Sequence, residues 1–205
     1  MRIAVTGATG QMGSNVIEEA RKRGLEVPVA VDRQETVEKN PDIQSDKKLE
    51  DLIEEHNVDA IIDFTTPEAS LNYLHVASDT DKPIVIGTTG FNDRQKEALD
   101  EASDNVPVLK ASNFSPAVNV LIELAQEASG KLEGYDIEIT ETHHNRKKDA
   151  PSGTAKKMLE RVKETRKNTE TVRGREGNSK RQEGEIGVHA RRAGDIRGSH
   201  ELLLA

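Results

Sequence analysis

Short apolar segments alternate with helical segments along the first 110 residues of the chain. Strands that alternate with helices build a parallel sheet whose two faces are both covered by helices. This pattern therefore predicts an α/β fold, with a doubly wound parallel domain spanning residues 1–115. The expected strands of this domain are 3–5, 27–31, 58–64, 84–86 and 106–110.

The pattern changes after residue 115, where helices and strands no longer alternate regularly. In one segment apolar and polar residues alternate one by one, which is typical of a half-buried antiparallel strand. The polar segment 164–184 is predicted to be a surface loop. Residues 116–205 are thus predicted to form an α+β domain with a mixed or antiparallel sheet. Its expected elements are helices at 118–128 and 153–163 and strands at 135–142, 185–191 and 196–204.

Composition excludes several classes of protein. The 205 residues include no cysteine, which excludes disulfides, thiolate zinc sites, iron–sulfur clusters and cysteine nucleophiles. The net charge of −8 disfavours nucleic acid and anionic membranes as partners. No apolar run approaches the ~20 residues of a membrane helix. Residues 1–5 enter a strand without the apolar region of a signal peptide, so the expected location is the cytoplasm.

Glycines at positions 7, 10 and 13 lie between the first expected strand and the first expected helix. This spacing lets the backbone approach a dinucleotide pyrophosphate at a helix N-terminus, although a tight turn without a ligand would show it too. Asp32 ends the second strand, where an acid binds ribose hydroxyls, and Arg33 beside it suits a 2′-phosphate. The alternative for these two residues is an ordinary surface ion pair. With a second glycine loop at 87–90, they predict a Rossmann-like domain that binds NADH and NADPH.

A second group of polar residues lies in the segment 141–154, where two imidazoles and three cations fall within six residues of an acidic chain. Such a cluster attracts a small polyanionic substrate. Residues 151–154 open a helix and offer backbone donors for a carboxylate. A solvated basic loop is the alternative, which the adjacent His143 and His144 at a strand end disfavour. The histidines show no His-x-x-x-His spacing, so no metal site is predicted.

Several segments of the chain match one known family. In this combination the chain resembles the dihydrodipicolinate reductases, also called 4-hydroxy-tetrahydrodipicolinate reductases, of lysine and diaminopimelate biosynthesis. The signature His-His-x-x-Lys-x-Asp-Ala-Pro-Ser-Gly-Thr begins here at His143 and is highly specific. The resemblance implies that NADPH and/or NADH reduces a cyclic imine dicarboxylate to tetrahydrodipicolinate, in a homotetramer built on the second domain's sheet. The matching segments are 7–13, 63–65, 87–91, 111–115, 141–154, 184–189 and 194–196.

The resemblance also implies roles for individual residues. His143 would be a proton donor and acceptor and Lys147 a proton donor, which makes 116–205 the substrate-binding and catalytic domain. His144, Gly153 and Thr154 would bind the substrate. Asp32 would bind the cofactor's ribose and Arg33 its 2′-phosphate. The pyrophosphate would be held by Gly7, Ala8, Thr9, Gly10, Gln11 and Met12, and the nicotinamide region would be lined by Gly87, Thr88, Thr89, Ala111, Ser112, Asn113 and Phe114, of which Phe114 also suits packing at a hinge.

The sequence departs from the family pattern at its end. Family members usually continue with a further strand and a helix after the segment that matches 201–205. One alternative is therefore a truncated, inactive fragment. The other is a non-enzymatic dinucleotide-binding sensor, which the glycine loop alone would permit. The presence of both His143 and Lys147 argues against the sensor.

Overall fold

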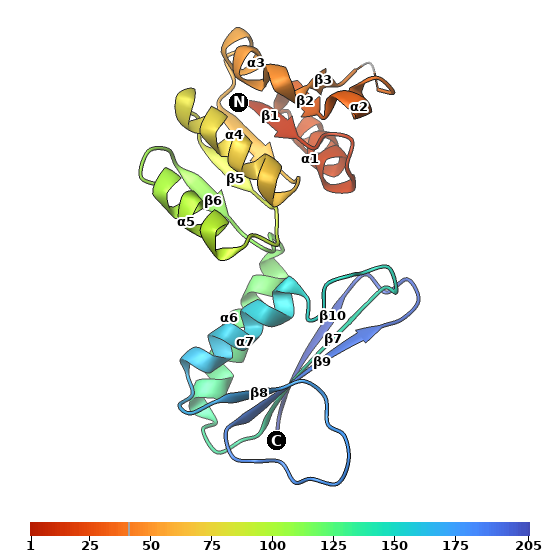
Figure 1. The fold of residues 1–205 in the computed structure, drawn as a ribbon, viewed down its shortest axis with the longest axis vertical. Helices are drawn as coiled ribbons and strands as arrows, with labels where there is room; N and C mark the ends of the chain where they lie inside the picture. Colours follow the sequence, from red (N-terminus) through yellow and green to blue (C-terminus); the bar gives the residue numbers. More distant parts are fainter. Residues whose placement is uncertain (41) are drawn as a thin grey trace. The chain divides into compact units, whose positions relative to one another are not determined.

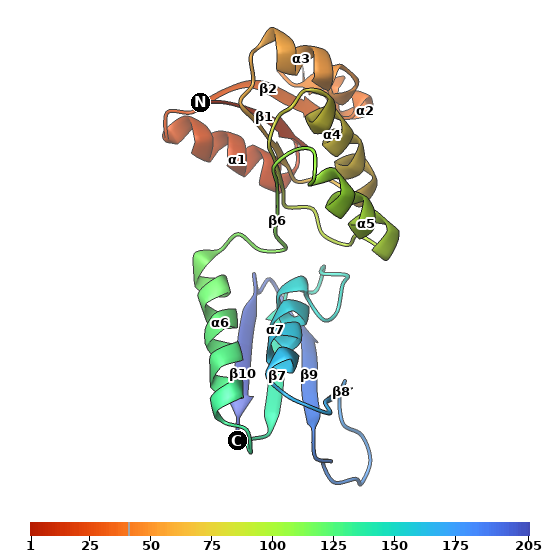
Figure 2. The same ribbon diagram turned by 90° about the vertical axis from the view of Figure 1, so that its left-hand side faces the viewer.

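The structure is a computed structural model that describes residues 1–40 and 42–205. The chain folds into two compact units, Met1–Ser112 and Asn113–Ala205 (Figures 1 and 2). The boundary lies three residues before the predicted division after residue 115. Asn113, Phe114 and Ser115 therefore belong to the second unit rather than the first.

The first unit contains a six-stranded parallel sheet within its described residues, in the order β3-β2-β1-β4-β5-β6. This confirms the predicted doubly wound sheet. The strand order reverses at β1, which lies between β2 and β4, and sheets of this kind bind ligands at the carboxyl ends of the strands beside that point. The elements are β1 (Arg2–Thr6), α1 (Gln11–Lys22), β2 (Glu26–Asp32), α2 (Gln34–Val37), β3 (Gln44–Ser45), a 3₁₀ turn (Asp46–Lys48), α3 (Leu49–Glu55), β4 (Ala60–Asp63), α4 (Pro67–Asp79), β5 (Ile84–Ile86), α5 (Asp93–Ala102) and β6 (Val108–Lys110).

Alternate side chains of these strands enter two separate cores. Ala4 and Ile61 pack with α3, α4 and α5 on one face, whereas Ile3 and Val5 pack with α1 on the other. Both faces are therefore covered by helices at the centre of the sheet, as the alternation predicts. The helices do not cover the edge strand β6 completely: its Leu109 side chain is 58% exposed.

The second unit is built on a four-stranded sheet in the order β10-β7-β9-β8, again within the described residues. The strand β7 is antiparallel to β10 but parallel to β9, so the sheet is mixed. This confirms the predicted mixed or antiparallel sheet, and the expected antiparallel pairing of β7 holds for β10 but not for β9. The predicted loop 164–184 contains the short strand β8, which pairs parallel with β9. The elements are α6 (Pro116–Lys131), β7 (Ile137–His143), α7 (Gly153–Glu164), β8 (Glu170–Val172), β9 (Glu185–Arg192) and β10 (Ser199–Leu204).

Helices α6 and α7 lie side by side on one face of this sheet (Figure 2). Ile137 and Ile139 of β7 pack against both helices in the core. Because side chains alternate along a strand, Glu141 and His143 point to the same face as these two isoleucines. The strand thereby delivers a carboxylate and an imidazole to the start of α7. Among the described residues, no helix is long and apolar enough to cross a membrane.

Candidate active site

The first glycine loop connects β1 to α1 by a very close backbone approach. Gly7 has a φ of +66°, which a side chain would disfavour. A Cβ atom on Gly13 would lie 2.1 Å from the Gly7 carbonyl oxygen, so the first turn of α1 packs directly on the loop. A Cβ on Gly10 would lie 3.2 Å from that same oxygen. The geometry is that of a strand–loop–helix anion site with free amides at the helix N-terminus.

Asp32 ends β2 and anchors this loop. Its carboxylate accepts hydrogen bonds from the Thr9 amide at 3.0 Å and the Thr9 hydroxyl at 2.7 Å. It also accepts one from the Arg33 amide at 2.8 Å. The sequence predicts a ribose-binding acid here; that the same acid holds the glycine loop appears only in the structure. The Arg33 side chain is exposed, and none of the described residues pairs with its guanidinium.

The second glycine loop follows β5 and rests on the end of β4. The Gly87 amide donates to the Asp63 carbonyl at 2.8 Å. A Cβ on Gly87 would lie 2.0 Å from the ring of Phe64, so the ring would have to move to admit any larger residue at this position. Of the two threonines predicted to line the nicotinamide region, Thr88 is buried and Thr89 is exposed to solvent.

The buried carboxylate of Asp63, at the end of β4, connects the ends of β1, β4 and β5 next to the two glycine loops. Asp63 is fully buried and accepts hydroxyl hydrogen bonds from Thr6 at 2.7 Å, Thr65 at 2.6 Å and Thr88 at 2.9 Å. The Ser70 hydroxyl donates to the same group. Sequence analysis used Asp63 only as part of a matching segment and missed this role. The missing information is tertiary, because Thr6 and Asp63 are 57 residues apart.

We expect Asp63→Ala to lower the free energy of unfolding by about 2–4 kcal/mol, because it leaves buried hydroxyls without their acceptor. For a chain of this length that corresponds to a fall in Tm of roughly 5–15 °C. Thermal and urea denaturation measure the change. Asp79→Ala, at an exposed position of α4, is the control and should stay within about 0.5 kcal/mol of the parent. Equal stability of the two variants would show that the Asp63 contacts contribute little.

The predicted catalytic histidine lies in the second unit, at the end of β7. His143 Nδ1 is 2.5 Å from Glu141 Oε2, and the histidine side chain is only 12% exposed. Arg192, at the end of β9, donates to both oxygens of Glu141 at 2.8 and 2.7 Å. The Ser152 amide donates to the same carboxylate at 3.0 Å. Burial by itself would raise the pKa of the Glu141 carboxyl, but these hydrogen bonds lower the pKa to about 2.

The predicted catalytic lysine is held in the loop between β7 and α7. Lys147 Nζ is 2.6 Å from Asp149 Oδ1, and its side chain is 23% exposed. The Asp149 carbonyl oxygen accepts a hydrogen bond of 2.6 Å from Arg192. Burial opposes the charged form of Asp149, yet the hydrogen bond from Lys147 keeps the pKa of this carboxyl below its usual value. The Arg192 guanidinium thus connects the two sites, because it binds Glu141 directly and also binds Asp149, the partner of Lys147.

His200 belongs to this cluster and was missed by sequence analysis. Its ring lies across that of His143, with centroids 5.3 Å apart and planes at 77°, and its Nε2 is 3.0 Å from the Ser152 hydroxyl. Burial and the charges of His143 and Lys147 lower the pKa of His200, against the opposite effect of Glu141. This direction favours the neutral form of the ring. The sequence could have indicated the position of Glu141, since residues two apart on a strand point to the same face and Glu141 is two residues before His143. No local pattern indicates His200 or Arg192, because only the pairing of β10 and β9 with β7 places them beside His143.

The predicted substrate residues lie beside this cluster. Gly153 and Thr154 form the first turn of α7, which Ser152 caps by accepting from the Ala155 amide at 3.2 Å. Thr154 Oγ1 accepts a hydrogen bond of 3.1 Å from the Asn113 side chain. The nitrogen His144 Nδ1 is buried, and no hydrogen-bond partner for it exists among the described residues. A predicted cofactor residue, Asn113, is therefore in contact with a predicted substrate residue.

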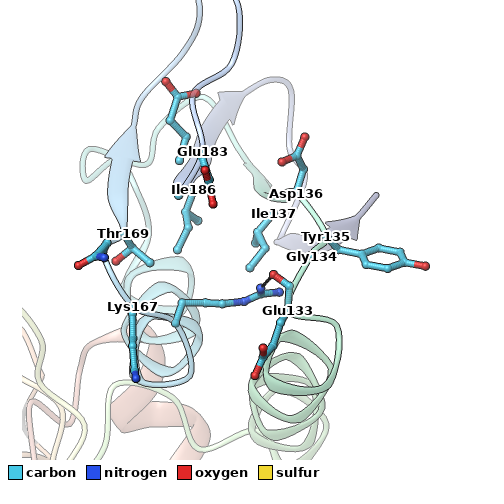
Figure 3. A pocket seen from close by; sticks show the side chains of 13 residues that line it. Glu133, Gly134, Tyr135, Asp136, Ile137, Lys167, Thr169, Glu183 and Ile186 are labelled. Atoms are coloured by element: carbon cyan, nitrogen blue, oxygen red, sulfur yellow. Dashed lines mark hydrogen bonds between the residues drawn. The ribbon is translucent and has the colours of Figure 1, made fainter.

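A separate cavity of about 600 Å³ lies at the opposite end of the second sheet (Figure 3). Ile137 and Ile186, the residues at the amino ends of β7 and β9, line it together with Glu133, Asp136 and Arg166. The Arg166 guanidinium donates to the Leu132 and Glu133 carbonyl oxygens at the end of α6. The lining contains no predicted site residue, so this cavity is distinct from the histidine cluster.

The two units combine a dinucleotide cradle of Rossmann type with a mixed-sheet unit that carries histidine, lysine and a clamped carboxylate. Dehydrogenases and reductases that use a nicotinamide dinucleotide pair a cofactor domain with a catalytic domain in this way, and the chain has the architecture of that class. More specifically, the chain belongs to the dihydrodipicolinate reductase family. It matches the family's N-terminal model, "Dihydrodipicolinate reductase, N-terminus", over residues 1–114 and the corresponding C-terminal model over residues 117–205.

Individual relatives agree with this assignment. The chain is 46% identical to the 4-hydroxy-tetrahydrodipicolinate reductase of Haloarcula marismortui, and the match covers 100% of this chain and 81% of the relative. The enzyme of the same name from Natronomonas pharaonis is also 46% identical, with 100% and 82% covered. Among solved structures, the dipicolinate-bound dihydrodipicolinate reductase of Paenisporosarcina sp. TG-14 matches with a TM-score of 0.77 at 26% identity, covering 100% of this chain and 83% of that one. The family resemblance and the prediction of an NAD(P)H-dependent oxidoreductase of lysine and diaminopimelate biosynthesis are confirmed.

Proposed function

We propose that the chain catalyses the NAD(P)H-dependent reduction of 4-hydroxy-tetrahydrodipicolinate to tetrahydrodipicolinate. The observation that carries the proposal is the anchoring of both signature groups beside α7: His143 on Glu141 at 2.5 Å and Lys147 on Asp149 at 2.6 Å. In the balanced reaction the substrate gains one hydride and one proton and releases one water molecule. The chain must therefore bind a dicarboxylate and control a proton.

The first unit has the features that a dinucleotide requires. A Cβ atom would clash with its neighbours at Gly7 and Gly13 and would be crowded at Gly10, and the N-terminus of α1 is left open for a pyrophosphate. Residues 7–12 would hold the pyrophosphate, and Asp32 would meet the ribose while it holds Thr9. The loops at 87–89 and 111–114 would line the nicotinamide region. When bound, NADPH or NADH supplies the hydride.

The second unit has groups suited to a dianionic substrate. The first-turn amides of α7, at Gly153 and Thr154, attract a carboxylate because the helix N-terminus carries partial positive charge. His144 would be a further polar contact for the substrate once its side chain turns, because its Nδ1 is buried and has no partner among the described residues. His143 and Lys147 are placed to supply a proton to the ring as electron density builds on it.

Turnover by the purified chain tests this function and its alternatives. Mixing the chain with NADPH and freshly made product of the preceding synthase should consume NADPH, which is followed by absorbance. Cofactor binding without turnover would contradict the proposal and favour a non-enzymatic dinucleotide sensor or an inactive form of the enzyme.

Arg33 is expected to discriminate between the two cofactors. Its exposed guanidinium follows Asp32 at the end of β2, so Arg33→Ala should weaken NADPH binding by about 1.5–3 kcal/mol and leave NADH nearly unchanged. That is a loss of roughly 10–150-fold in affinity, measured by fluorescence titration with each cofactor. Arg94→Ala, an exposed position on α5, is the control. Equal losses for both cofactors would show that Arg33 does not contact the 2′-phosphate.

The proposed assembly is a homotetramer formed through the second sheet, located in the cytoplasm with its soluble cofactor. The face of the sheet opposite α6 and α7 supports this assembly, because Leu203 of β10 lies there and is 58% exposed. Light scattering coupled to gel filtration should give about four times the chain mass of 22.5 kDa. A mass near that of one chain would contradict the tetramer without affecting the proposed chemistry.

A further inference from the structure

The groups around Glu141 determine where the ring of His143 carries its proton. Glu141 Oε2 is 2.5 Å from His143 Nδ1. An ionised carboxylate accepts hydrogen bonds and donates none. Nδ1 must therefore be the donor in this contact, and in the neutral ring the other nitrogen, Nε2, is left with its lone pair.

Glu141 is held firmly in the ionised form. It is fully buried, and Arg192 donates to both of its oxygens in a bidentate pair, while the Ser152 amide donates to Oε1. These three donated hydrogen bonds stabilise the ionised carboxylate, which then accepts from His143 as well. The low pKa of this carboxyl agrees with that arrangement.

The Nε2 side of the ring is left open by a glycine. A Cβ on Gly198 would lie only 3.0 Å from His143 Nε2, so any larger residue would crowd this nitrogen. The His200 ring, at 77° to that of His143, packs against it and restricts its rotation. The imidazole is thus oriented by one nitrogen and open at the other.

We propose that Glu141 and Arg192 are positioning residues that keep the proton of neutral His143 on Nδ1, so that Nε2 takes up a proton from solvent and then donates it, from the imidazolium, to the substrate. Arg192 also donates to the Asp149 carbonyl, and Asp149 pairs with Lys147. The same guanidinium therefore sets the positions of both proposed proton donors. The inference rests on the proposed function for its consequence in catalysis, but its structural part does not depend on the substrate.

The decisive variant is Glu141→Gln. Oε1 faces two obligate donors, Arg192 and the Ser152 amide. Oε2 faces only one, Arg192, together with the His143 Nδ1 atom, which can also accept. The glutamine oxygen should therefore occupy the Oε1 position. The glutamine NH₂ then faces His143 Nδ1 and donates to it, which forces the ring proton onto Nε2. Imidazole ¹⁵N chemical shifts of the histidine-labelled full chain report the tautomer, and His143→Gln identifies the signals. We expect Nδ1–H in the parent protein and Nε2–H in Glu141→Gln.

Kinetics of the same variant measure the consequence. A general acid or base with its proton on the wrong nitrogen loses roughly 10²–10⁴-fold in kcat, and KM should change by less than about threefold because Glu141 does not face the substrate. The matched control is Glu138→Gln, which lies on the same strand but faces the opposite side of the sheet. Glu138 contacts His189 Nε2 at 2.6 Å, so this variant should alter the His189 signals while kcat stays within about twofold of the parent.

Gly198→Ala provides a second test at an exposed position. Because Gly198 has a φ of +158° and precedes β10, the Tm of this variant must stay near that of the parent for its kcat to be compared. Its methyl group should lower kcat by about tenfold or more and leave the Nδ1–H tautomer unchanged. An Nε2–H ring in the parent protein, or an unchanged tautomer and kcat in Glu141→Gln, would overturn the proposal. Absence of turnover in the parent protein with the expected tautomers would instead contradict the proposed function and leave the Nδ1–H assignment standing.

Discussion

Replacing His143 by glutamine or Lys147 by alanine is expected to lower turnover by about 10²–10⁴-fold, the usual span for a lost general acid. Both groups lie at the carboxyl end of β7 and are anchored by carboxylates of the same unit. The proposed cofactor cradle, in contrast, is formed by the glycine loops of the first unit. NADPH affinity should therefore stay within a few-fold of the parent in both variants.

The two variants should differ in KM. Lys147 carries a fixed positive charge that attracts the substrate dianion, so Lys147→Ala should raise KM as well as lower kcat. His143 acts on the proton, so His143→Gln should affect mainly kcat. Steady-state kinetics paired with NADPH titration measure both quantities.

Matched controls separate chemistry from general charge effects. Lys148→Ala removes the neighbouring exposed cation, and His189→Gln removes a histidine on the other face of the sheet; both should keep near-parent turnover. Near-normal kcat in either signature variant would show that this residue is not the proton donor. A large loss of NADPH binding would place the cluster in the cofactor site and contradict the proposed division of roles.

Gly13→Ala should weaken NADPH binding by about 10–100-fold, which corresponds to roughly 1.4–3 kcal/mol. The new Cβ would lie 2.1 Å from the Gly7 carbonyl oxygen and 3.0 Å from Ala8 Cα, both backbone atoms that cannot rotate away. The loop and the first turn of α1 must therefore move apart, which displaces the amides that face the pyrophosphate. Overpacking of this kind should also lower the free energy of unfolding by about 1–3 kcal/mol.

Fluorescence titration and urea denaturation measure the two effects of Gly13→Ala separately. Gly134→Ala is the control, because no heavy atom lies within 4 Å of a Cβ built at that position. A variant at Gly13 that binds NADPH normally would show that the close approach of α1 to the loop is not needed for the cofactor.

The local pattern of the sequence predicted the parallel sheet of the first unit and five of its six described strands, but not the two-residue edge strand β3. Hydrophobic periodicity reports which side chains face a core, and the glycines mark where the backbone must turn sharply, so β1, α1 and the loop between them were predicted. The predictions were less accurate where the signal was weak. The strand β8 has only three residues within a polar segment, and the parallel pairing of β7 with β9 has no signature in either strand alone.

The sequence by itself determined the family, the parallel sheet and the identity of the signature residues, because each depends on residues close together in the chain. Only the tertiary structure decided how those residues are held. Glu141 and Arg192 are 51 residues apart, and Thr6 and Asp63 are 57 apart, yet each pair shares hydrogen bonds in a buried site. Strand pairing creates these contacts: the register of β7 with β9 and β10 places Arg192 and His200 beside His143 and Glu141. A buried carboxylate is stable only when such distant donors surround it, and therefore its role becomes visible only in the folded chain.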